Sequence, residues 1–241
     1  MQPHPGNLLR RIDLSIPPVG FYDAPDPSAF APLVEPVSGK RACTFSFWQN
    51  WLNGETLHIT RDNYGCPGAG YWLCRVETMS RQDFVKFLVD GEGLRASHDL
   101  MNQWFDQLGG YKQQHAHLLI GPLQEQQYEY LRTVTFYVNP DQLSILMHGA
   151  QYNHRPGAPL PVLAPMGSGC GQLAAVFDDM RIPQSVIGTT DIAMRQHLPS
   201  DILAFTVTRS MFEQLCELDE RSFLYKSFWQ NLRKVRGLPD L

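Results

Sequence analysis

The tightest constraint on this chain is local and lies at residues 64–70, which read Tyr-Gly-Cys-Pro-Gly-Ala-Gly. A short apolar run, Leu57-His58-Ile59, precedes the stretch, and a proline directly follows Cys66. Proline is favoured at the first position of a helix, because its missing N–H group has no partner to lose there. We therefore expect a turn from a strand into a helix, with Cys66 at the helix N-terminus. Free N–H groups and the helix dipole stabilise a thiolate in that place.

Two more cysteines are expected at helix starts. Apolar and aromatic residues recur at helical spacing over 42–54, which makes Cys43 the opening residue of a helix. Cys170 lies in the glycine-rich segment 166–171, ahead of an apolar run that we expect to be helical through Phe177. Thiolates are soft ligands that suit zinc, copper(I) and iron–sulfur clusters. If these three cysteines converge, they predict a metal or cluster site with one coordination position left open for a small molecule.

A plainer interpretation of the cysteines stays open beside this hypothesis. Free cysteine is among the most buried residue types, so all three could simply be small apolar residues at tight turns. Cys74 and Cys216 lie within apolar helical patterns, and we expect both in the core. The odd total of five cysteines and the absence of a signal-peptide pattern argue against a disulfide framework. A cysteine nucleophile with a histidine base has no supporting motif here.

Composition and charge limit the classes of function. Hydrophobic residues make up 43% of the chain and charged residues 18%, which is enough apolar material for a sizeable core. The net charge of −4 gives no electrostatic reason to expect nucleic acid or an anionic membrane as a partner. No apolar run approaches the roughly 20 residues that cross a bilayer. We expect a cytoplasmic protein whose partner is a small molecule, and the sequence leaves its oligomeric state open.

Strand and helix patterns alternate along the chain, which favours an α/β or mixed α+β fold in a single domain over 1–241. Two weakly similar halves around a mixed sheet are expected, 16–152 and 160–235, with 155–165 as the connecting loop. In this interpretation, Cys43 with strand 55–60 corresponds to Cys170 with strand 185–190. Strands 133–138 and 203–207, each followed by a capped helix, form the second matching pair, and the expected capping residues are Asn139 and Ser210. Further strands are expected at 17–22 and 117–122, and further helices at 1–15, 81–89, 97–108, 210–218 and 221–235.

The pattern as a whole resembles a known family, the uncharacterised archaeal and bacterial domain of unknown function 169. The resemblance extends over roughly 15–220 and is strongest from Cys43 to Ala69. Other parts that carry it are Pro18-Val19-Gly20-Phe21, Gly54-Glu55-Thr56-Leu57, Gly169-Cys170 and Val186-Ile187-Gly188 with Asp191 and Arg195. The resemblance favours the metal-site hypothesis but implies no activity. Asp191 stands where a fourth cysteine would complete the set of ligands.

Several other residues are candidate ligand contacts. Gly169 belongs to a glycine-rich turn that could cradle a phosphate or another anion. Asp191 and Arg195 follow a strand end, where α/β proteins often bind ligands, although a local salt bridge would also account for them. Tyr64 and Gly65 flank Cys66, Tyr64 either as a hydrogen-bond donor or as a packed aromatic ring.

Two functions therefore remain in competition. The first is a protein that holds a metal or an iron–sulfur cluster at Cys43, Cys66 and Cys170, with or without enzymatic activity. The second is a metal-free module that binds an anion or a nucleotide at its glycine-rich helix starts.

Overall fold

The computed structural model describes residues 6–37, 43–107, 111–165, 167–177 and 179–239. Within these ranges the strands form one mixed sheet of eight strands, in the order β2-β3-β4-β1-β5-β8-β7-β6. The predicted α/β mixed fold is therefore confirmed. The strands are β1 (Val19–Ala24), β2 (Leu33–Val34), β3 (Thr56–Ile59), β4 (His117–Pro122), β5 (Leu131–Val138), β6 (Val162–Leu163), β7 (Ser185–Gly188) and β8 (Leu203–Thr208).

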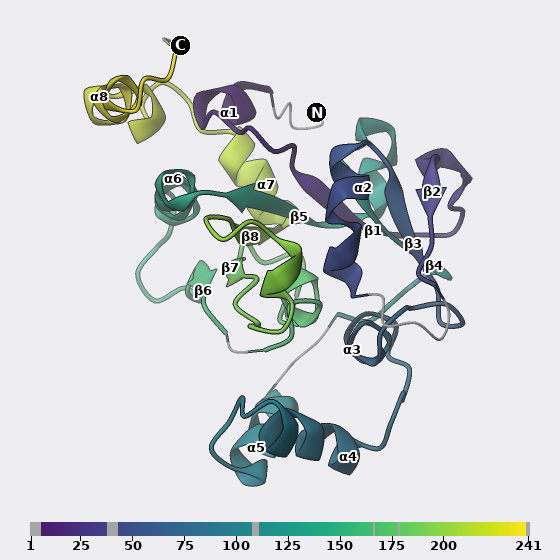
Figure 1. Ribbon diagram of the computed structural model, residues 1–241. Helices are drawn as coiled ribbons and strands as arrows, with labels where there is room; N and C mark the ends of the chain where they lie inside the picture. The colour runs from purple at the N-terminus through teal and green to yellow at the C-terminus, as the bar shows by residue number, and fades with distance from the viewer. Residues whose placement is uncertain (1–5, 38–42, 108–110, 166, 178, 240–241) are drawn as a thin grey trace.

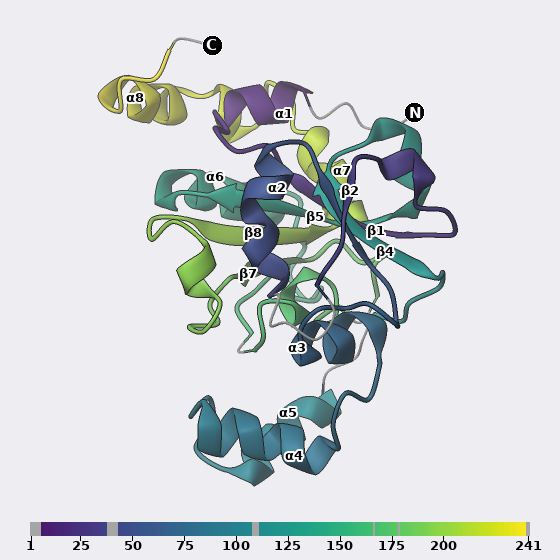
Figure 2. The same ribbon diagram turned by 45° about the vertical axis from the view of Figure 1, so that its right-hand side comes forward.

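Helices cover both faces of the sheet (Figures 1 and 2). The α-helices are α1 (Gly6–Arg11), α2 (Trp48–Leu52), α3 (Pro67–Ala69), α4 (Arg81–Lys86), α5 (His98–Gln107), α6 (Pro140–Gln151), α7 (Arg209–Cys216) and α8 (Ser227–Val235). Shorter 3₁₀ and π turns are η1 (Ser28–Phe30), η2 (Thr44–Phe47), η3 (Gly70–Cys74), η4 (Phe87–Gly91), η5 (Glu125–Tyr130), η6 (Gly171–Leu173), η7 (Arg195–His197) and η8 (Phe223–Tyr225).

The central strand β1 is buried on both sides, and its side chains pack alternately into two separate cores. Phe21 packs into the core that contains α2, η3, α4 and the cysteines. Tyr22 packs into the core that contains α1, α6 and α7. The cysteine region therefore lies on one face of the sheet, and the capped helices α6 and α7 support the sheet from the other.

The sheet consists of two units with the same topology. In the first unit, β1 pairs antiparallel with β4, β4 with β3, and β2 lies parallel to β3. In the second unit, β5 pairs antiparallel with β8, β8 with β7, and β6 lies parallel to β7. The antiparallel pair β1 and β5 joins the units. The repeat therefore matches β1 with β5, β2 with β6, β3 with β7 and β4 with β8.

The second unit begins at β5, so the boundary differs from the one predicted from sequence. The loop 155–165 lies inside the second unit and contains β6 rather than separating two halves. Strands 55–60 and 185–190, seen as β3 and β7, hold equivalent places as predicted. Strands 133–138 and 203–207 do not, because β5 and β8 are neighbours within one unit. Each of these strands leads into a helix because a capping residue, Asn139 or Thr208, lies at its end. The shared pattern does not come from the repeat.

The two units differ most in one connection. Between β7 and β8, residues 189–202 hold only the turn η7, whereas between β3 and β4, residues 60–116 hold α3, η3, α4, η4 and α5. Helices α4 and α5 form a helical hairpin that stands away from the sheet (Figures 1 and 2). The buried carboxylate of Asp23 holds the returning chain, accepting hydrogen bonds from the Tyr111 hydroxyl at 2.6 Å and the Gln114 N–H at 2.7 Å.

Several predicted helices differ in detail from the structure. The predicted helix from Cys170 through Phe177 is only the 3₁₀ turn η6, because glycines flank Cys170 and the backbone leaves helical geometry at Ala174, where φ is −152°. Helix α7 is capped by the Thr208 side chain, which accepts from the Met211 N–H, and not by Ser210. The predicted helix 42–54 is divided into η2 and α2. Residues 1–5, Ala42, Leu108 and Met166 of the predicted elements lie outside the described residues.

Candidate thiol-lined pocket

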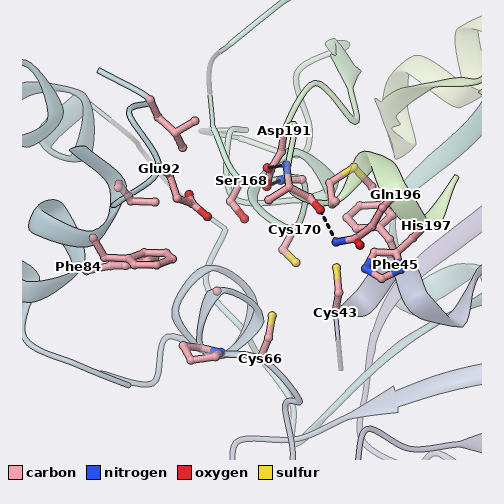
Figure 3. A pocket seen from close by; sticks show the side chains of 18 of the residues that line it. Cys43, Phe45, Cys66, Phe84, Glu92, Ser168, Cys170, Asp191, Gln196 and His197 are labelled. Atoms are coloured by element: carbon pink, nitrogen blue, oxygen red, sulfur yellow. Dashed lines mark hydrogen bonds between the residues drawn. The ribbon is translucent and has the colours of Figure 1, made fainter. Parts of the chain in front are cut away.

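A pocket of about 560 Å³ lies between the sheet and the helical hairpin, and three thiols open into it. Figure 3 shows the sulfur atoms of Cys43, Cys66 and Cys170 pointing into the same space. The structure thus brings together the three cysteines that the sequence singled out. The lining residues are Cys43, Phe45, Cys66, Pro67, Gly68, Met79, Phe84, Phe87, Leu88, Glu92, Leu94, Ser168, Gly169, Cys170, Asp191, Ala193, Met194, Gln196 and His197.

Cys66 occupies the turn predicted from its neighbours. Its backbone is extended, Pro67 is the first residue of α3, and the Cys66 Sγ accepts a hydrogen bond from the Ala69 N–H at 3.5 Å. Gly65 supplies a left-handed φ of +77° just before the cysteine, which a residue with a side chain rarely adopts. The local sequence therefore fixes both the position of the sulfur and a donor that favours its thiolate form.

Cys170 is positioned by glycines that let its segment pass between aromatic rings. A Cβ atom on Gly169 would lie 2.7 Å from Phe45 Cε2, and one on Gly171 would lie 3.5 Å from Trp72. The Cys170 side chain is 4% exposed, and its Sγ lies 3.4 Å from the Thr44 Oγ1. Gly169 therefore serves close packing against Phe45, which is a different role from the anion cradle expected from the sequence.

Cys43 is the residue before η2, and its carbonyl accepts hydrogen bonds from both the N–H and the hydroxyl of Ser46, at 2.8 and 2.7 Å. It lies in the connection between β2 and β3, and Cys170 lies in the equivalent connection between β6 and β7. Cys66 and Asp191 lie in the third pair of equivalent connections, after β3 and β7. The sheet repeat therefore accounts for the convergence of these four side chains.

The three thiols differ in acidity. The side-chain hydrogen bond with Cys170, helped by the Ala69 and Gly68 N–H groups and opposed by burial, lowers the pKa of Cys66 to about 6. The same interaction with Cys66, together with burial, raises the pKa of Cys170. Burial raises the pKa of Cys43 to about 11. Cys66 is therefore the most acidic of the three thiols that line the pocket.

Two carboxylates face the pocket beside the thiols (Figure 3). Asp191 accepts from the Gly169 N–H at 3.3 Å and from the Ala193 N–H at 3.0 Å, which fixes both of its oxygens. Partial burial, reinforced by the charge of Asp191, raises the pKa of Glu92. No lysine or arginine occurs among the described residues that line the pocket. Its charge and its apolar wall suit a neutral or cationic ligand with apolar surface.

Three other expected ligand contacts lie outside the pocket. The Tyr64 ring packs against Gly70, where an added Cβ would lie 2.7 Å from Tyr64 Cδ2. Gly65 provides the left-handed backbone conformation of the turn before Cys66. The Arg195 guanidinium donates to the carbonyls of Ile202, Pro199 and Ser200, and therefore closes its own loop instead of pairing with Asp191.

Sequence reasoning missed the wall that the helical hairpin contributes. Met79, Phe84, Phe87, Leu88 and Leu94 supply this apolar wall, with Glu92 at its edge. Their helical spacing was recognisable, but it is typical of any amphipathic helix. Only the tertiary placement of the hairpin shows that part of its apolar face borders a pocket. Gln196 and His197, on the opposite side, carry no motif that could have identified them.

The remaining cysteines and histidines have other partners. Cys74 is buried in the core, as predicted, whereas Cys216 is only partly buried on α7 and packs against the edge of a core. His117 Nδ1 lies 2.9 Å from His58 Nε2, and His58 Nδ1 lies 3.0 Å from Glu35 Oε1. This hydrogen-bonded chain lies across β3 and β4 and away from the pocket lining. Among the described residues, no group of three or more His, Cys, Asp or Glu side chains is arranged to hold a single metal ion.

Fold and pocket together define an α/β protein built from two repeated units, with a thiol-lined pocket of small-molecule size where they meet the hairpin. The chain belongs to the domain of unknown function 169 family: the family model, described as uncharacterised ArCR, matches residues 7–218 of its 241. The resemblance expected from the sequence is thereby confirmed. No curated protein and no solved structure matches the chain. In the described part of the chain, every helix is too short or too polar to cross a bilayer.

Proposed function

We propose that the protein binds an iron–sulfur cluster through Cys43, Cys66 and Cys170, and that the pocket beside these thiols receives a small molecule. The observation that carries the proposal is the convergence of three thiols, from three separate segments, on one pocket. Thiolates are the usual ligands of such clusters. The proposal places the protein in the cytoplasm, where thiols stay reduced.

A cluster agrees better with the side-chain arrangement than a single zinc ion does. Structural zinc is held by four ligands with zinc–sulfur bonds of about 2.3 Å, which draws the sulfurs tightly around one point. The described side chains form no such group. A cluster places its own metal and sulfide atoms between the ligands, so its cysteines surround a larger volume. The pocket provides that volume.

An unpaired buried hydroxyl behind the thiols also supports the proposal. Tyr137 is 1% exposed, and its hydroxyl has no hydrogen-bond partner within the described part of the chain. Burial, followed by the nearby thiols of Cys170 and Cys43, raises the pKa of Tyr137, so the hydroxyl keeps its proton. A buried donor without an acceptor costs free energy. A sulfur acceptor that gains negative charge would satisfy it, and hydrogen bonds to sulfur tune cluster potentials.

The residues of the pocket would then have separate roles in binding. Three thiolates would hold the cluster, and one metal position would have no cysteine ligand from this set. A cluster with an open position supplies a Lewis-acid or electron-transfer centre when bound. Asp191 is held toward this region by two backbone N–H groups. The hairpin wall excludes water from one side and contacts the apolar part of the small molecule.

The alternative, an anion or nucleotide on the glycine-rich turns, receives less support. Anion sites normally combine backbone N–H groups with a cationic side chain. The described pocket lining contains two carboxylates and no lysine or arginine. The one backbone N–H of Gly169 that could meet an anion already donates to Asp191.

The test is iron and sulfide analysis, with an absorption spectrum, on protein purified without oxygen. We expect bound iron and a visible absorption band in the wild type, and loss of both in Cys43→Ser, Cys66→Ser and Cys170→Ser. Cys216→Ser is the matched control, because Cys216 is partly buried on a different face of the sheet, and it should keep the band. Protein that stays colourless after anaerobic purification and after reconstitution with iron and sulfide would refute the proposal.

A further inference from the structure

We propose that Cys66 and Cys170 form a reversible disulfide bond when the metal-free protein meets a disulfide oxidant. The inference does not depend on the cofactor, because it concerns the thiols themselves. It follows from the way two distant segments, 66–68 and 168–170, are packed against each other.

The segment at the start of α3 lies next to the segment that carries Cys170. A Cβ atom on Gly68 would lie 3.7 Å from Ser168 Oγ and 3.9 Å from Cys66 Sγ, so α3 begins directly against the segment that carries Cys170. Both cysteines line the same pocket, and their side chains interact directly. Figure 3 shows the two sulfur atoms on facing walls of the pocket. A disulfide requires two Cα atoms within about 7 Å, which only closely packed segments provide.

Cys43 is a weaker partner for either sulfur. Its thiol affects those of Cys66 and Cys170 through charge, whereas Cys66 and Cys170 share a side-chain hydrogen bond. Its own segment is fixed by the two Ser46 hydrogen bonds to its carbonyl. The pair joined by a side-chain hydrogen bond within the pocket is therefore Cys66 with Cys170.

Accessibility sets the order of the two exchange steps. Cys66 is partly exposed and Cys170 is buried, so a small disulfide reaches Cys66 first. The Cys66 thiolate attacks one sulfur of glutathione disulfide, forms a mixed disulfide and releases one glutathione thiolate. The Cys170 sulfur then attacks the Cys66 sulfur, its proton passes to the second departing glutathione, and the protein disulfide forms. Two protein thiols are oxidised, and one glutathione disulfide is reduced to two glutathiones.

The bond would have a direct effect on the pocket. It ties α3 to the Cys170 segment and withdraws two of the three sulfurs from any other use. Oxidation would therefore close the site, and a reducing thiol would reopen it. The oxidised protein keeps the free thiol of Cys43 but has lost those of Cys66 and Cys170. Alkylation of the free thiols therefore distinguishes the oxidised protein from the reduced one.

The experiment treats full-length metal-free protein with glutathione disulfide, alkylates the remaining thiols and maps the peptides by mass spectrometry. We expect the wild type to lose two of its five thiols and to yield a Cys66–Cys170 cross-linked peptide, reversed by dithiothreitol. Cys170→Ser should stop at a glutathione adduct on Cys66, and Cys66→Ser should form neither product. Cys43→Ser is the matched control and should still form the cross-link.

Three outcomes would overturn the inference: five free thiols after treatment, a stable glutathione adduct on Cys66 in the wild type, or a cross-link that contains Cys43. The wild-type map alone decides among these, so the result stands even where a variant folds poorly. Failure of the cluster proposal would leave this test unchanged, because the protein carries no metal during it. A positive map with no bound iron would separate the two ideas.

Discussion

The carboxylate of Asp191 accepts a hydrogen bond from the backbone N–H of Gly169 at 3.3 Å, and Gly169 is the residue before Cys170. The second oxygen of Asp191 accepts from the Ala193 N–H at 3.0 Å. One side chain thus joins the loop 189–202 to the cysteine segment. The position that would complete a four-cysteine set instead holds the residue that fixes one of the three cysteines.

Asp191→Ala should lower the free energy of unfolding of the metal-free protein by about 1–2 kcal/mol, since two backbone donors lose a charged acceptor. Asp191→Asn should lower it less, because the amide oxygen still accepts one bond. Urea denaturation measures both values. Asp201→Ala is the control, an exposed carboxylate in the same loop, and should leave the midpoint unchanged. Equal midpoints for Asp191→Ala and wild type would contradict this account.

Alkylation of Cys66 should follow a pKa of about 6, whereas Cys43, with a pKa of about 11, should react only at high pH. The thiolate is the reactive form, so the rate rises with pH and reaches its plateau just above the pKa. At neutral pH, iodoacetamide should therefore modify Cys66 first, as judged by peptide mass spectrometry.

The control for this measurement removes the main cause of the shift. In Cys170→Ala, the hydrogen bond that lowers the pKa of Cys66 is gone, so the rate profile should move toward higher pH. Burial then becomes the largest remaining influence and raises the pKa of Cys66, while the Ala69 and Gly68 N–H groups oppose it. An unchanged profile in Cys170→Ala would show that the two thiols do not interact.

Asp23→Asn should loosen the attachment of the helical hairpin. The carboxylate is fully buried and accepts from Tyr111, Gln114 and the His115 N–H, the last at 2.8 Å. An amide offers one acceptor oxygen in its place, and the loss should amount to about 3 kcal/mol. Limited proteolysis should then cut within 75–116 faster than in wild type. Asp62→Asn, at an exposed position in the same connection, should be cut at the wild-type rate.

The cap of α7 can be tested by comparing two neighbouring hydroxyls. Thr208 accepts from the Met211 N–H at 3.3 Å and donates to the Ile182 carbonyl at 2.9 Å, and it is fully buried. Thr208→Ala should cost about 2 kcal/mol of unfolding free energy. Ser210→Ala, which removes a 3.3 Å bond to the Met180 carbonyl and a 3.2 Å hydrogen bond with the Thr208 hydroxyl, should cost less than about 1 kcal/mol. A larger loss of unfolding free energy in Ser210→Ala than in Thr208→Ala, measured by urea denaturation, would instead identify Ser210 as the cap.

Local chemistry explains which parts of the structure the sequence could predict. The Cys66 turn follows from a proline and a left-handed glycine next to the cysteine, and the structure confirms it. The helix after Cys170 fails for an equally local reason, because the flanking glycines weaken a helix and Gly169 is needed for packing against Phe45. The convergence of the cysteines depends on the pairing of β1 with β5, which no local pattern encodes.

The apolar wall of the pocket could not be predicted from the sequence, for the same physical reason. Phe84 and Leu88 repeat at helical spacing, as they would in any helix that packs on a core. Their exposure to a pocket depends on Asp23, which holds the returning chain from the far end of the hairpin. For Arg195, proximity in the sequence suggested the wrong partner. A charge beside Asp191 looked like its partner, but backbone carbonyls nearer to the guanidinium satisfy it.

The repeat in the sheet distributes the pocket between two pieces of chain. A cut between β4 and β5 would leave Cys43 and Cys66 on one fragment, and Cys170 and Asp191 on the other. Neither fragment alone would hold more than half of these four side chains. Co-expressed fragments would rebuild the pocket only by pairing β1 with β5. The thiol chemistry of such a split protein would therefore act as a reporter of complementation, active only when the two halves have found each other.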